Sequence, residues 1–132
     1  YAGDGFYPLG LACFFGHMDV AEVLLGAGAD PNQAASNAMK VAPLHAAAAA
    51  GRADIVALLL EKGANPNARQ QMGFVPLHEA ARAGNLDLAH LLVDHGADVN
   101  AATDDGKRPL AIAVEAGKTE MAAYLESKGA AD

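Results

Sequence analysis

The feature that most constrains this chain is a segment that recurs four times. Pro-Leu pairs occur with spacings of 35, 33 and 33 residues, at Pro8-Leu9, Pro43-Leu44, Pro76-Leu77 and Pro109-Leu110. Gly-Ala pairs keep the same spacing, at Gly28-Ala29, Gly63-Ala64, Gly96-Ala97 and Gly129-Ala130. A fixed period of about 20–50 residues indicates stacked units that bury their apolar faces against one another. The sequence therefore predicts a repeat protein.

Each copy predicts two short helices. A proline suits the first turn of a helix, because its missing N–H needs no partner there. A glycine such as Gly51 can then take the left-handed conformation that ends the helix. A carboxylate stands where the second helix is expected to begin, where it faces the positive end of the helix dipole. These carboxylates are Asp19, Asp54, Asp87 and Glu120.

Composition supports an all-helical chain. Of the 132 residues, 32 are alanine, 5% are aromatic and none is Trp, and such small side chains suit close helix packing better than a sheet. We expect one domain over residues 1–132. Its predicted copies are residues 1–34, residues 35–69 with a two-residue insertion in the loop, residues 70–102, and residues 103–132 as the C-terminal cap.

The repeated unit resembles the ankyrin repeat. The third copy carries the resemblance best, with GFVPLHEAARAGNLDLAHLLVDHGADVNA from Gly73 to Ala101. The resemblance covers essentially the whole chain. The alanine-rich composition of the copies is more similar to that of bacterial ankyrin proteins than to that of animal ones. It implies an α/α solenoid of helix-turn-helix units with protruding β-hairpin loops. It also implies a binding module that docks a partner protein on its concave side.

The copies depart from the ankyrin pattern at the first helix. The family's threonine before proline is replaced in all four copies, by Tyr7, Ala42, Val75 and Arg108. His45 and His78 keep the histidine that normally pairs with it, whereas Gly10 and Ala111 do not. We expect local loosening without a change of fold. The insertion before the second copy places Lys40 where the other copies have glycine and predicts an irregular loop tip.

The two ends of the stack differ. Glu126 stands where the earlier copies have Leu25, Leu60 and Val93, and a polar residue there predicts a cap that faces water. The first copy keeps the apolar pattern of an interior unit. We therefore expect another helix pair or a partner, self-association included, to cover the start of the stack.

The net charge and the cysteine content limit the kinds of partner and the cellular compartment that the sequence predicts. The net charge is −7, from 9 basic and 16 acidic side chains, with no basic stripe of the kind that binds nucleic acid. No apolar run approaches the about 20 residues that span a bilayer, so no membrane contact is expected. A single cysteine allows no internal disulfide, which favours a reducing, cytoplasmic location. Because the sequence begins at Tyr1, we leave open whether a targeting segment lies upstream.

Residues capable of catalysis or metal binding all have structural explanations. His17, His45 and His78 occupy recurrent positions, and His90 and His95 are five residues apart, a spacing that does not place two ligands on one helix face. Cys13 aligns with Ala48, Ala81 and Val114, which are expected to be buried, and is itself expected in the core. The run from Thr103 to Gly106 lacks the ligands of a calcium loop. We expect no catalytic residue, no metal and no cofactor, and hence no enzyme.

The ankyrin resemblance places partner contacts at the loop tips and on the exposed side of the first helices. The residues at these positions are Asp4, Phe6, Phe14, Phe15, Met39, Val41, Arg69, Gln71, Met72, Phe74, Arg82, Asp104, Asp105, Lys107 and Glu115. Phe14 and Phe15 are the most informative, since small or polar residues suffice there. One of them could instead pack on a loop or an upstream unit, Phe6 and Phe74 could support their loops, and Met39 could fill space.

Two functions from different classes follow. The first is a module that binds another protein through the groove of the first three copies, where Phe, Met and Arg resemble the composition of interface cores. The second is a structural or regulatory segment of a larger protein, with its open N-terminal face packed against a neighbouring domain. An enzyme would need a pocket with convergent polar groups, which the sequence does not indicate.

Overall fold

The computed structural model describes residues 8–34 and 41–131, which form four antiparallel helix pairs. The helices are α1 (Pro8–Phe14), α2 (Met18–Gly26), α3 (Pro43–Ala49), α4 (Ala53–Glu61), α5 (Pro76–Ala83), α6 (Leu86–Asp94), α7 (Pro109–Glu115) and α8 (Thr119–Ser127). A single 3₁₀ turn, η1 (Gln71–Gly73), precedes α5. The predicted all-helical solenoid is confirmed.

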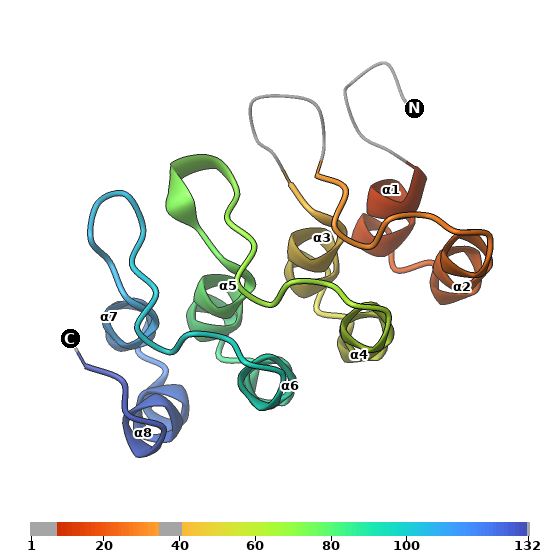
Figure 1. Ribbon diagram of the computed structural model, residues 1–132. Coiled ribbons are helices and arrows are strands. Elements are labelled where there is room, and N and C mark those ends of the chain that lie inside the picture. The colour runs from red at the N-terminus through yellow and green to blue at the C-terminus, as the bar shows by residue number, and fades with distance from the viewer. Residues whose placement is uncertain (1–7, 35–40, 132) are drawn as a thin grey trace.

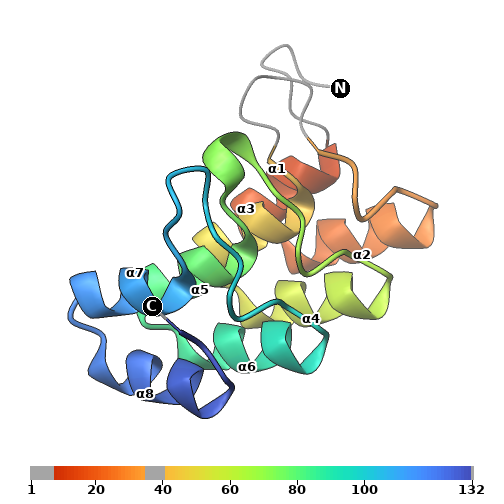
Figure 2. The same ribbon diagram turned by 60° about the vertical axis from the view of Figure 1, so that its left-hand side comes forward.

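The helices form two rows. Figure 1 shows the first helices of the pairs, α1, α3, α5 and α7, side by side in one row and the second helices in the other. The loops before α5 and α7 project beyond the row of first helices, and Figure 2 shows the same arrangement from another side. Each first helix therefore has one side toward its own partner helix and another toward the loops.

The helix ends follow the predicted chemistry. All four repeated prolines are the first residue of a helix, and the predicted carboxylates lie in the first turn of the second helices. Gly51, two residues after the end of α3, has a φ value of 72°, and Gly84, directly after α5, has a φ value of 70°. These left-handed conformations stop each helix at low cost because glycine has no Cβ.

The core runs continuously between the two rows. Leu44 and Leu77 from the first helices and Leu59 and Leu92 from the second helices are fully buried. Alanine fills the places where helices approach one another, and Cys13 is buried with them, as predicted. The apolar core of each pair is thus shared with its neighbours, as expected for a stacked repeat.

A ladder of asparagines joins successive copies. The Asn32 side chain donates to the carbonyl of Gly63 at 3.0 Å and accepts from the N–H of Asn65 at 2.7 Å. Asn67 and Asn100 make the same two bonds one and two copies further along. The constant offset of these asparagines in the sequence therefore reflects a repeated bridge between neighbouring turns.

The β-hairpins predicted for the loops form only in part. One cross-loop backbone bond closes each of two loops, from the N–H of Gln70 to Phe74 and from the N–H of Thr103 to Lys107, both 2.9 Å. No strand is present in residues 8–34 and 41–131, because a single bond does not build a ladder. The inserted loop with Met39 and Lys40 lies outside the described residues.

The fourth copy, predicted as a C-terminal cap, is only partly polar on its outer side. Glu126 is exposed, as predicted for a residue that faces water. Val114 of the same copy is 61% exposed, although its equivalents Cys13, Ala48 and Ala81 are buried. The polar character of this end of the stack is therefore limited to its second helix, and its role as a cap stays a prediction.

Candidate functional site

A hollow of about 170 Å³ opens over α3 on the side that faces the loops. Its floor includes Ala46 and Ala49 of α3, while Phe14 from α1 and Phe74 from the next loop contribute aromatic walls. The hollow is lined by Phe14, Val41, His45, Ala46, Ala49, Gln70, Phe74, Val75 and Glu79. It exists because α3 carries alanine where the equivalent positions of the other copies hold Phe14, Arg82 and Glu115.

The two adjacent phenylalanines of α1 and its following turn play different parts. Phe14 is 54% exposed and contributes to the hollow, whereas Phe15 is 65% exposed and does not line it. Their rings meet edge to face with centroids 5.3 Å apart, a geometry that aromatic pairs favour. Neither ring is buried against the described residues, so both remain available on the surface.

Phe74 supports its loop and also forms part of the surface. Its ring meets the ring of His78 edge to face at 5.5 Å, and the side chain is half-buried. It lines the hollow over α3 and also a second, more polar depression beside α5 that includes Gln70, Arg82 and Ile112. Phe74 therefore packs against its own loop and helix while part of it lines the surface, and its contact with a partner stays a prediction.

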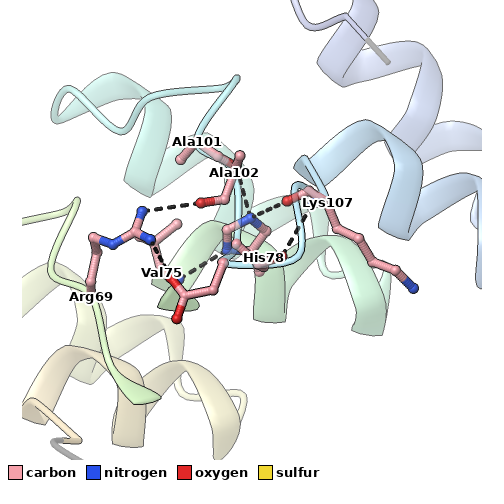
Figure 3. A network of polar contacts seen from close by, with 8 residues as sticks. Arg69, Val75, His78, Ala101, Ala102 and Lys107 are labelled. Atoms are coloured by element: carbon pink, nitrogen blue, oxygen red, sulfur yellow. Dashed lines mark hydrogen bonds and ion pairs between the residues drawn. The ribbon is translucent and has the colours of Figure 1, made fainter. Parts of the chain in front are cut away.

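His78 holds the third loop against the fourth (Figure 3). Its Nδ1 accepts from the N–H of Val75 at 2.9 Å, and its Nε2 faces the carbonyls of Ala101 at 2.8 Å and Lys107 at 3.2 Å. Because both partners of Nε2 are acceptors, this nitrogen carries the proton of a neutral ring. Both ring nitrogens of His78 are therefore satisfied by backbone groups, although Val75 stands where the ankyrin pattern has threonine.

His45 makes the equivalent contacts one copy earlier. Its Nδ1 accepts from Ala42 at 3.1 Å and its Nε2 donates to the carbonyl of Ala68 at 2.6 Å. Burial lowers the pKa of both His45 and His78 below the usual 6.5, because the charged imidazolium would lose hydration. The two histidines are therefore neutral structural ties.

Three ion pairs neutralise much of the charge on the loop side of the stack. Arg69 pairs with Asp104 at 3.1 Å and donates to the carbonyl of Ala102, linking two loops (Figure 3). Arg82 pairs with Glu79, one turn earlier on α5. The third pair joins Lys107 to Glu115 at 3.1 Å. Several side chains predicted to meet a partner therefore already have partners within the chain.

Only part of the predicted contact set meets at the hollow. Phe14, Val41 and Phe74 line it together, while Gln71 and Met72 are exposed at the tip of the third loop. Arg69, Arg82, Asp104, Lys107 and Glu115 form the ion pairs, and Asp105 is exposed. Asp4, Phe6 and Met39 lie outside the described residues.

Six residues that line the hollow are not in the predicted contact set: His45, Ala46, Ala49, Gln70, Val75 and Glu79. Ala46 was overlooked because a small side chain gives no signal of binding, yet its size creates the space. The alignment of the copies contains the useful signal, which is a pair of alanines on α3 between larger residues on α1 and α5.

The described residues offer little reactive chemistry. Burial raises the pKa of the Cys13 thiol to about 12, so almost no nucleophilic thiolate forms near neutral pH. Among residues 8–34 and 41–131, no group of three His, Cys, Asp or Glu side chains is arranged to hold a metal ion. No helix in this part of the chain has the length and apolar character needed to cross a membrane.

Comparison with protein families agrees with this architecture. The family described as "Ankyrin repeats (3 copies)" matches residues 2–70 and 69–132, which together span nearly the whole chain. The chain belongs to the ankyrin repeat family. A search of curated proteins found no match. Ankyrin repeats generally form non-catalytic folds that bind other proteins, and the hollow over α3 lies on the first-helix and loop side of this ankyrin stack.

Proposed function

We propose that this ankyrin stack binds another protein and that the partner anchors itself in the hollow over α3. The observation that carries the proposal is the alanine floor between two phenylalanine walls. Such a hollow accepts a bulky side chain from a partner, and aromatic residues are enriched where interfaces contribute most binding energy. We further propose that the chain itself is not an enzyme and works in the reducing cytoplasm, with Cys13 as a buried free thiol.

The charge pattern favours an uncharged anchor. Glu79, the acidic residue that lines the hollow, already pairs with Arg82, and the neighbouring ion pairs are also internal. A charged anchor would have to break one of these pairs or lose hydration without a new partner. An aliphatic or aromatic side chain fits better, and nucleic acid and membrane are not part of the proposal.

Affinity capture tests this proposal. The protein with Phe14→Ala, Phe15→Ala and Phe74→Ala should lose a partner that the unchanged protein captures from a lysate of its source cells. The far-UV circular dichroism should stay the same, because Phe14 and Phe15 are exposed and Phe74 is only half-buried. Unchanged capture by a folded triple variant would place the binding surface elsewhere.

A structural or regulatory segment of a larger assembly is the second candidate. The observation in its favour is the apolar surface of α2, where Val20 and Val23 are exposed. A helix that presents such side chains to water is typical of an interface with another element. The two candidates are compatible, since the hollow and the exposed face of α2 involve different residues.

A further inference from the structure

One face of α2 is open where the other second helices are covered. Val20 is 49% exposed, whereas its equivalents Ile55, Leu88 and Met121 are 0–1% exposed. Leu24 is partly exposed, whereas its equivalent in every later copy is fully buried. Val23 is 70% exposed. We call Val20, Val23 and Leu24 the upstream face.

The interior of the stack shows what covers such a face. The preceding helix pair packs against each later one, α1 on α3 and α2 on α4, and again α3 on α5 and α4 on α6 (Figure 1). The preceding pair brings an aliphatic residue on its second helix, Leu25 or Leu60, and a small residue on its first helix, Cys13 or Ala48, all of them buried. Within the described residues, the upstream face presents the same apolar positions with no helix pair packed on them.

The backbone beside the upstream face has a second open place. In each later copy an asparagine from the copy before bridges a glycine carbonyl and an N–H two residues further on, as Asn32 does for Gly63 and Asn65. The equivalent groups in the first copy are the carbonyl of Gly28 and the N–H of Asp30. No asparagine reaches these two groups among the described residues.

We propose that the upstream face is a stacking interface for one further ankyrin-type helix pair. The occupant has an aliphatic residue on its second helix, a small residue at the Cys13 position of its first helix, and an asparagine in its trailing loop. It packs on α1 and α2 as these pack on α3 and α4. This interface is independent of the hollow over α3.

A second copy of the chain does not meet these requirements. In head-to-tail stacking, Glu126 would lie where an aliphatic residue belongs, and Val114 would lie where a small residue belongs. Burying an unpaired carboxylate against an apolar face is costly.

A chain extension tests the proposal directly. Residues 69–101 are added as a duplicate ahead of Tyr1, which places the next proline nine positions after the duplicated Asn100, as Pro109 follows Asn100. The duplicate supplies the required aliphatic residue, its copy of Val93, the small residue Ala81 and the asparagine. In a matched control extension, the duplicated Val93 becomes Glu and the duplicated Asn100 becomes Ala.

The readout is hydrogen exchange of the α2 amides together with thermal unfolding. The extended chain should protect α2 at least tenfold more than the 132-residue chain and unfold about 4 °C higher, while the control extension should restore the exchange of the unextended chain. Val20→Ala should lower the midpoint in the extended chain and leave the 132-residue chain nearly unchanged. Equal α2 exchange in all three chains would overturn the proposal. A stable dimer of the 132-residue chain with α2 already protected would also overturn it, because the occupant would then be a second copy.

Discussion

Replacing His78 with alanine tests how strongly the imidazole ties the third and fourth loops together. The ring contacts the N–H of Val75 and the carbonyls of Ala101 and Lys107, at 2.8–3.2 Å. A buried polar group that loses its partner costs about 1–3 kcal/mol. Val75 is buried, so its N–H would lack a partner, whereas Lys107 is exposed and its carbonyl can turn to water.

One orphaned N–H, one weakened carbonyl contact and the lost packing of a buried ring together predict a loss of about 2–4 kcal/mol. Urea unfolding followed by circular dichroism measures this as a lower midpoint with an unchanged slope. His95→Ala is the matched control, because His95 is exposed and its ring contacts a single carbonyl among the described residues, that of Leu91 one turn earlier. That control should change stability by less than about 0.5 kcal/mol. A loss below about 1 kcal/mol for His78→Ala would refute the structural role assigned to the ring.

Three further predictions concern stability and reactivity. Stability should fall as the pH drops below 6.5, because the pKa of His45 and His78 is lowered in the folded chain and the unfolded chain therefore takes up protons first. The urea midpoint measured from pH 7.5 to 5 should show this fall, and the fall should be shallower for His78→Ala. Gly10→Ala should stabilise the chain by about 0.5–1 kcal/mol, since Gly10 lies inside α1 with nothing within 4 Å of an added Cβ. Gly51→Ala should destabilise the chain by about 1 kcal/mol, because the φ value of Gly51 is +72°. The Cys13 thiol should react with a thiol reagent only at the rate of unfolding, and rapid labelling of the folded chain would contradict its burial.

Much of the fold could be predicted because its determinants are local and repeated. Pro43 marks a helix start and Gly51 marks a helix end through their own backbone preferences, whatever surrounds them. The exposure of Glu126 and the apolar pattern of the first copy, which includes Val20, could also be predicted by comparing the copies. The role of Asn32 was not, because its amide bonds to residues about thirty positions away and the sequence shows only that the residue recurs.

The candidate site was less predictable because it depends on pairing across copies. Arg69 and Asp104 were each expected to face a partner, and only their 3.1 Å separation shows that they face one another. The hollow depends as much on the small side chains of Ala46 and Ala49 as on the large side chain of Phe14. Sequence patterns that look for large or charged residues overlook a site whose floor is alanine.

Filling the hollow without removing any contact is the most direct test that it anchors a partner. Ala49→Leu occupies the floor, and Ala50→Leu adds the same side chain one residue later, at an exposed position outside the hollow. Peptides selected from a random display library on the unchanged protein should bind Ala49→Leu at least tenfold more weakly and Ala50→Leu with unchanged affinity. Equal binding to both variants would contradict a partner anchor over α3.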